Sequence, residues 1–548
     1  MAHPVPIRYL AGSLLSAVLA AGTVQAQVVD SPRINPGAAL ERQLEELERL
    51  ERERETTPDD QPAIEGVEPD REGNLPDDDT PRLQLGDIRY NESAFISADE
   101  LWDITDEYLG RPVSFADLNQ MLARINAIYA SRGIITARAV IPAQRIEGGI
   151  LEIRLVEGRL GKLVVEENHY TRADYLTRGL PLEAGEVVDL PALRDAINYF
   201  NRVNDVNMRA NLARGEGFGE TDVIIRAAEP PRIQGQVFAD NNGAESTGEG
   251  QGGIYGIWNG PFGRDDRLTL FAIGSEGTRN AFMSYRLPIN RSGGRLTIAG
   301  AYNRLEIIES GFAGLDITGG SSEISLAYDQ PFLRADTWWL DGYTRLSRSE
   351  SETEIDDAFA LSDNTVDRLS LGGRVRGFGE HTQWSLRQGV TGGQVAENIF
   401  GDDTSFWALD GDVSLSAFLP HRLIARFRGG WQYTDDEDLP SSAQFQVGGV
   451  STVRGYPVSA VSGGRGVYGN LELHWQARPG LVPFTFADAG YVDGVSPGNE
   501  SISSIGLGLN WRHRAFGAEL VLAHTLDDVL PDQDENRLHA RISYDFAL

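Results

Sequence analysis

The chain has 548 residues, a formal net charge of −32 and no cysteine. This length is enough for several domains, and the missing cysteine excludes disulfides, thiolate metal sites and thiol catalysis. The negative charge argues against nucleic acid as a partner, because phosphates would be repelled unless a basic patch were set apart, and the sequence has no such patch.

The first segment has the pattern of an export signal. Arg8 precedes an apolar run over residues 9–21, and small residues up to Ala26 form a cleavage-like site. We therefore expect a signal peptide over residues 1–26, and an uncleaved membrane anchor is the less favoured alternative. No later stretch approaches the ~20 apolar residues that a spanning helix needs.

Residues 27–80 are predicted to be a helix followed by a linker. Leu40, Leu44 and Leu47 recur at helical spacing within residues 38–55, and Glu and Arg fill the other faces. Such a charged helix is either solvated, or part of a short coiled coil, or lodged in a polar cavity. Residues 56–80 are rich in Pro, Asp and Glu, which is typical of a flexible acidic linker.

Two segments, 81–158 and 159–230, share a predicted β-α-α-β-β order. In the first we expect a strand over 83–90, helices over 97–109 and 114–132, and strands over 134–141 and 149–156. In the second we expect a strand over 160–166, helices over 171–179 and 189–201, and strands over 206–213 and 221–227. Each segment has the size of a small domain. Duplication of a small α+β unit in an exported chain indicates a binding arm rather than an enzyme.

The remaining residues, 231–548, repeat a pattern of alternating apolar and polar positions. Leu471, Leu473 and Trp475, for example, alternate with Asn470, Glu472 and His474. Successive strand side chains point to opposite faces, so one face is apolar and the other is charged. A soluble sandwich would bury the apolar face, whereas a transmembrane barrel exposes it to lipid. The export signal favours the barrel, and the length suits about sixteen antiparallel strands.

Four short motifs follow one another along the chain. The first runs from Tyr129 to Gly133, after the second helix of the first repeat, and the second consists of residues 240–243 and 247–248. The third is Val453-Arg454-Gly455-Tyr456, and the fourth consists of Phe486, Asp488 and Gly490. With the repeats and the export signal, they make the whole chain resemble the outer-membrane transporters of two-partner secretion. This is the haemolysin and filamentous-haemagglutinin secretion and activation type, whose barrels carry polypeptide-transport-associated (POTRA) repeats. One departure is the terminal Leu548, where the family commonly has an aromatic residue; Phe546 would take that place.

The resemblance implies a transporter of the outer membrane with POTRA repeats in the periplasm. It would hold a large β-helical exoprotein, an adhesin or a cytolysin, in unfolded form and pass it through the pore without ATP. The resemblance implies a monomer and no cofactor, and it leaves open the identity of the client and its activation. The alternatives are a barrel-assembly factor, a passive porin and a soluble periplasmic binding protein; two repeats behind a helix favour secretion.

The resemblance also implies the site residues. Arg454, at the tip of a loop folded into the lumen, would reach Asp488 on the wall, since a guanidinium forks onto a carboxylate through two parallel bonds. We expect this pair in a wet lumen, where breaking it costs less than the ~3–5 kcal/mol of a fully buried pair. The helix over 38–55 would correspond to the family's plug and rest in the pore.

Client binding is assigned to a sheet edge of the second repeat. An extended peptide adds to such an edge through main-chain hydrogen bonds. The strand over 206–213 is our candidate, with partner-binding residues Val206, Met208, Ala210 and Leu212, and a covered structural strand is the alternative. The eight histidines lack metalloprotease spacing and no nucleophile elbow is evident, so we expect neither a catalytic nor a metal site.

Overall fold

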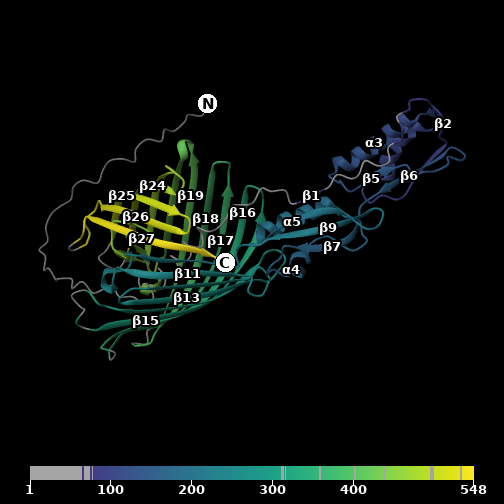
Figure 1. Ribbon diagram of the computed structural model, residues 1–548. Helices are drawn as coiled ribbons and strands as arrows, with labels where there is room; N and C mark the ends of the chain where they lie inside the picture. The colour runs from purple at the N-terminus through teal and green to yellow at the C-terminus, as the bar shows by residue number, and fades with distance from the viewer. Residues whose placement is uncertain are drawn as a thin grey trace, which may run out of the picture. The chain divides into compact units, whose positions relative to one another are not determined.

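The computed structural model describes residues 64–66 and 75–548, apart from gaps at 77, 310–313, 315, 357–358, 400, 402, 437–438, 494–498 and 531–532. The predicted signal peptide and the predicted helix over 38–55 lie outside the described residues. Along the chain, the described part contains one short strand, β1 (Ile64–Gly66), then two small α+β units and a closed barrel (Figure 1).

The first α+β unit follows the predicted order. Its main elements are β3 (Asp87–Tyr90), α2 (Ala98–Thr105), α3 (Phe115–Ser131), β5 (Arg138–Val140) and β6 (Ile150–Val156). The sheet order is β3-β6-β5, with β3 parallel to β6. Both helices begin at a capping box, in which Ser97 exchanges bonds with Glu100, and Ser114 with Asp117. These boxes satisfy main-chain N–H groups that a helix start would leave unpaired.

Two strands of this unit are shorter than predicted. The segment over 83–90 breaks at the buried Leu85 into β2 (Leu83–Gln84) and β3, because the carbonyl of Leu85 accepts the N–H of Gly110 instead of continuing the ladder. β2 pairs with β4 (Pro112–Val113). The strand expected over 134–141 is reduced to β5, because the helix end and a turn occupy its first residues.

The second unit repeats the plan but gains a strand. Its elements are β7 (Arg159–Glu166), α4 (Ala173–Thr177), α5 (Leu190–Val203), β8 (Asn207–Arg214) and β9 (Glu220–Ala228). The sheet order is β1-β8-β9-β7, with β1 parallel to β8. Part of the segment predicted to be a flexible linker is therefore a strand, and Ile64 packs against the apolar core of the unit. None of the helices in the described ranges is long and apolar enough to cross a membrane.

Sixteen strands form the closed barrel, as predicted. They are β10 (Ile233–Asp240), β11 (Gln251–Asn259), β12 (Arg267–Gly274), β13 (Thr278–Pro288), β14 (Arg295–Glu306), β15 (Ile317–Arg334), β16 (Trp338–Ile355), β17 (Phe359–Phe378), β18 (Thr382–Glu397), β19 (Thr404–Leu419), β20 (Leu423–Tyr433), β23 (Arg465–Trp475), β24 (Leu481–Asp493), β25 (Glu500–His513), β26 (Phe516–Thr525) and β27 (Asn536–Ala547). Each pairs antiparallel with the next, and β27 pairs with β10 to close the cylinder. In Figure 1 the last, yellow strands accordingly lie beside the first, teal ones.

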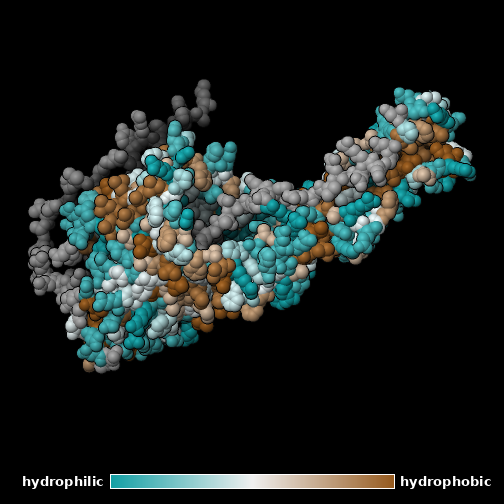
Figure 2. All heavy atoms as spheres, in the orientation of Figure 1, coloured by the Kyte–Doolittle hydropathy of each residue, from teal (hydrophilic) through white to brown (hydrophobic). Residues whose placement is uncertain are grey.

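The barrel wall separates the two faces that the sequence alternation predicts. On β23, Leu471 is 56% exposed, whereas its neighbours Asn470 and Glu472 are buried. Large apolar side chains are exposed in the same way on the other strands and gather on the visible wall in Figure 2. Exposed aromatics mark one end of the strands at Trp258, Trp338, Trp384, Phe418, Trp475, Trp511 and Phe516, and the opposite end at Tyr302, Trp407, Tyr433 and Tyr491. An apolar band flanked by aromatic girdles is the outer surface of a barrel that spans a lipid bilayer.

Candidate functional site

The loop between β20 and β23 carries the first half of the candidate site. It contains a small hairpin of β21 (Phe445–Val447) and β22 (Val461–Gly463). The loop turns at Gly448 and Gly449, whose φ angles are 123° and 89°. Glycine adopts these angles without the steric penalty that other residues meet. The turn leads into the predicted motif, Val453 to Tyr456, whose four residues are all buried.

Arg454 binds two carboxylates on the barrel wall. Its Nε lies 2.8 Å from Oδ2 of Asp488, and its Nη2 lies 2.7 Å from Oδ1 of the same residue. Its Nη1 donates to Oε1 of Glu472 at 2.7 Å. The guanidinium carbon also lies 3.7 Å from the ring centre of Phe486. Phe486 and Asp488 share one face of β24, and both contact the same arginine side chain.

Asp488 is held by more than the arginine side chain. It is 2% exposed and also accepts the main-chain N–H of Arg454 at 3.2 Å and the Nδ2 of Asn470 at 2.8 Å. The hydroxyl of Ser504 lies 3.4 Å from its Oδ2 and accepts the N–H of Gly455 at 3.2 Å. A buried carboxylate needs such donors, because its transfer from water is costly unless it is paired and hydrogen-bonded.

Two histidines and one glutamate complete the site, and sequence reasoning missed all three. Glu472 bonds Arg454 with one oxygen, and its other oxygen lies 2.7 Å from Nε2 of His474. Nε2 of His539 lies 2.8 Å from the carbonyl oxygen of Arg454. The alternation on β23 places Glu472 and His474 on the polar face, but nothing in it indicates that Glu472 meets the loop.

Apolar packing holds the rest of the loop tip. Val453 and Tyr456 belong to a buried cluster that also contains Val447, Ala460, Val461, Val492 and Ile502. The hydroxyl of Tyr456 donates to the carbonyl of Asp527 at 2.7 Å. A Cβ on Gly490 would collide with Val447, and one on Gly455 would lie 2.8 Å from the Cβ of Ser504. The two glycines in the motifs therefore allow the loop to approach the wall closely.

The surroundings of the arginine differ from the expectation of a wet lumen. Arg454 is 6% exposed and Glu472 is 8% exposed. The loop packs over its own ion pairs and excludes water from them. The energy scale of a fully buried pair, ~3–5 kcal/mol when one partner is removed, therefore applies here.

The first-repeat motif has a structural role. Tyr129 lies near the end of α3 and is 1% exposed. Its hydroxyl donates to Oε1 of Glu157 at 2.8 Å and lies 3.4 Å from the hydroxyl of Ser93. Burial, together with the Glu157 carboxylate, raises the pKa of Tyr129. Gly133 has a φ of 74°, the left-handed conformation that commonly follows a helix end.

The candidate client strand β8 is covered by β1, and its named side chains point inward. Without β1, β8 would be an edge strand of the sheet of the second unit; β1 pairs with it at that edge. Val206, Met208, Ala210 and Leu212 are all buried in the core of the second unit. This corrects their assignment as partner-binding side chains. A strand added to β8 would instead form hydrogen bonds with the main chain of β8. It would contact the half-buried side chains that alternate with these four residues.

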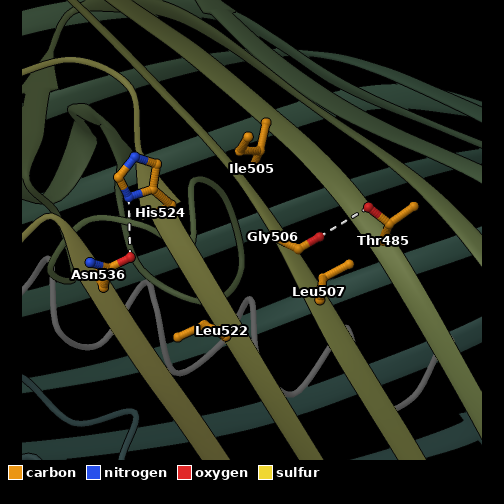
Figure 3. A pocket seen from close by; sticks show the side chains of 7 residues that line it. All are labelled: Thr485, Ile505, Gly506, Leu507, Leu522, His524 and Asn536. Atoms are coloured by element: carbon orange, nitrogen blue, oxygen red, sulfur yellow. Dashed lines mark hydrogen bonds between the residues drawn. The ribbon is translucent and has the colours of Figure 1, made fainter.

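A hollow of about 280 Å³ lies elsewhere, on the outer wall across β24 to β27 (Figure 3). The hydroxyl of Thr485 donates to the carbonyl of Gly506, and Nδ1 of His524 lies 3.1 Å from Oδ1 of Asn536. Its other lining residues include the exposed Leu507 and Leu522. The hollow therefore belongs to the apolar outer surface and not to the arginine site.

Comparisons with known proteins agree with this architecture. The family described as haemolysin secretion/activation protein ShlB/FhaC/HecB matches residues 219–511, and the ShlB-type POTRA domain matches residues 83–158. The outer membrane transporter CdiB of Dickeya dadantii is 26% identical over 455 residues, which cover 76% of each chain. The heme/hemopexin transporter protein HuxB of Haemophilus influenzae is 22% identical, covering 81% of this chain and 83% of its own.

The fold is also that of a solved structure. CdiB from Escherichia coli superposes with a TM-score of 0.62 at 20% identity, covering 94% of this chain and 99% of its own. The matched family consists of transporters and not enzymes, and its members place the barrel in the outer membrane and the POTRA domains in the periplasm. The chain is thus an outer-membrane transporter of the two-partner secretion type and belongs to the haemolysin secretion/activation family ShlB/FhaC/HecB.

Proposed function

We propose that the chain binds a large, unfolded secreted protein through its POTRA repeats and passes it through the barrel without ATP. The client is a β-helical exoprotein, either an adhesin or a cytolysin. The edge of β8 carries this proposal, because β1 already pairs with it, Ile64 opposite Ala210 and Gly66 opposite Leu212. Main-chain pairing of this kind demands little of the client's sequence.

The strand β1 occupies the edge that the client needs. An incoming client strand therefore has to displace β1 and form the main-chain hydrogen bonds that β1 forms with β8. Because Ile64 packs against the core of the second unit, the client strand needs an apolar side chain opposite Ala210 to restore that contact. Export is driven by folding of the client outside the cell, since a folded chain is withdrawn from the equilibrium across the pore.

A disulfide that holds β1 on β8 tests whether this edge binds the client. Glu65 and Asn211 are opposite one another in the register, and the chain has no other cysteine to interfere. Neighbouring strands are close enough for a disulfide between opposite positions. The oxidised Glu65→Cys/Asn211→Cys variant should stop export, reduction should restore it, and the single Asn211→Cys variant is the control. Equal export by the oxidised and reduced forms would refute the edge as the client site.

The plug belongs to the same proposal. We propose that the helix predicted over residues 38–55 rests in the pore and leaves it when the client docks. Deleting these residues alone, with β1 retained, should raise the single-channel conductance in planar bilayers. Unchanged conductance would remove the plug from the mechanism.

A further inference from the structure

The connection between α5 and β8 meets the barrel at a cluster of five charged residues. Asp205 accepts hydrogen bonds from Nη2 of Arg267 at 2.7 Å and from Nη2 of Arg286 at 3.0 Å. Asp265, in the turn between β11 and β12, accepts one from Nη2 of Arg295 at 2.7 Å. The Asp265 and Arg295 side chains are only 3% and 11% exposed. Asp205 is half-buried at 34%.

The same cluster holds the main chain that leads into β8. The two carboxylate oxygens of Asp265 accept the N–H groups of Asp205 and Val206, both at 3.1 Å. Arg295 donates to the carbonyl of Val203 at 2.9 Å. Asp265 also has a φ of 58°, a conformation that costs free energy for a residue other than glycine. The carboxylate in this position supplies the hydrogen bonds that water would otherwise give to the start of β8.

The arginines place this cluster on the inner rim of the pore. Arg267 and Arg286 are opposite one another in the β12–β13 register. Arg267 shares a strand face with the buried Thr269 and Phe271, whereas Leu270 on the other face is 50% exposed. Like charges directly opposite on neighbouring strands destabilise a sheet. Asp205 lies between the two guanidiniums and offsets this repulsion, and they hold the pKa of its carboxyl low despite its burial.

We propose that Asp205 and Asp265 are positioning residues that fix the start of β8 at the inner rim of the pore. A client strand paired with β8 is thereby delivered to the lumen entrance, since β8 begins at Asn207, directly after the anchored Val206. This inference rests on the proposed function of β8 as the client edge. It adds that binding at the edge and transfer into the pore are separable steps.

The positioning itself can be measured without a client. Spin labels at Glu183→Cys, in the exposed loop before α5, and at Glu380→Cys, in the exposed turn between β17 and β18, report the distance between the second repeat and the barrel. We expect one narrow distance population in the full-length protein and a broadened one after Asp205→Ala. The Glu216→Ala variant, which removes an exposed ion pair with Lys162, should leave it narrow. An unchanged distribution in Asp205→Ala would overturn the proposal.

Transfer is measured with an epitope-tagged β-helical exoprotein of the proposed client class as the probe, expressed together with the transporter. In Asp205→Ala, photo-crosslinking of this probe to position 211 should persist, while secretion falls about tenfold, the change that ~1.4 kcal/mol produces. Asp205→Glu should recover part of the secretion, because it restores the charge. Heat-modifiable migration on gels checks that the barrel is folded, and Asp205→Asn replaces any variant that fails this check.

The outcomes separate this inference from the function on which it rests. If the wild-type transporter neither crosslinks nor secretes the probe, the proposed function fails. If the wild type does both and Asp205→Ala secretes as much as Glu216→Ala, the client edge stands and the positioning role is refuted. Loss of crosslinking together with secretion in a folded Asp205→Ala variant would also refute it, because binding and transfer would then not be separable.

Discussion

Replacing Arg454 by alanine should detach the loop from the barrel wall. The variant loses two hydrogen bonds to Asp488 and one to Glu472, at 2.8, 2.7 and 2.7 Å. It also loses the contact of the guanidinium with Phe486. Two carboxylates on neighbouring strands would then be left in a buried site without their cation.

The structure sets the size of the effect. Removing one partner of a buried ion pair costs ~3–5 kcal/mol, because the other partner stays buried without compensation. Here the stranded carboxylates regain water if the loop moves away, but the loop then loses the packing of Val453 and Tyr456. We therefore expect the free energy of unfolding to fall by about 3 kcal/mol, at the low end of that range.

Urea unfolding of the barrel in lipid vesicles, with hydrogen exchange of the loop amides, measures both consequences. The matched control is Arg348→Ala, whose ion pairs with Glu350 and Asp367 are long and exposed. Such surface pairs contribute about 0–1 kcal/mol. Arg454→Lys keeps the charge but cannot fork onto a carboxylate, so it should fall between the two.

One result would refute the reasoning. If Arg454→Ala and Arg348→Ala unfold at the same urea concentration and the loop amides stay equally protected, Arg454 does not hold the loop. The apolar cluster around Tyr456 would then be sufficient to hold it.

Three further predictions concern other parts of the chain. Tyr129→Phe removes the hydrogen bond to Glu157 and should destabilise the first repeat by about 1 kcal/mol in thermal unfolding; an unchanged midpoint would contradict this role. The main-chain N–H of Ser114 at the helix cap lowers the pKa of Asp117. The Asp117 carboxylate therefore contributes fully to stability above the ordinary pKa of 3.8, and this contribution is lost as the pH falls through the lowered pKa. Circular dichroism of the first repeat should show helix loss in strong acid but not at pH 5. Gly490→Val should collide with Val447 and cost about 1–3 kcal/mol of barrel stability, and protease sensitivity of the loop should rise with it.

The sequence was sufficient for the architecture because strand alternation is a local property. Each strand of the barrel has one apolar and one polar face, and residues 231–548 have room for about sixteen such strands; the structure has sixteen. Helix starts in the first repeat are local in the same way, since Ser97 and Ser114 cap α2 and α3 through partners three positions further along the chain.

Predictions failed where a distant part of the chain decides the conformation. The strand expected over 83–90 breaks at Leu85 because its carbonyl is taken by Gly110, 25 positions away. Residues 64–66 lie in a segment whose composition is typical of a flexible linker, yet they pair with β8. The pairing partner supplies the order that the local sequence lacks.

The candidate site, too, was predicted only in part. Alternation assigns Glu472 and His474 to the polar face of the wall. Asp488 shares a strand face with Phe486, so its lumen position and its pairing with Arg454 came from the family resemblance. Neither alternation nor the resemblance shows that Glu472 is a second partner of Arg454, or that the loop buries the whole group. Periodicity reports the face on which a side chain lies, but which faces meet depends on the strand register and on the path of the loop between β20 and β23. These are set by packing among residues far apart in the chain, and only the folded barrel brings them together.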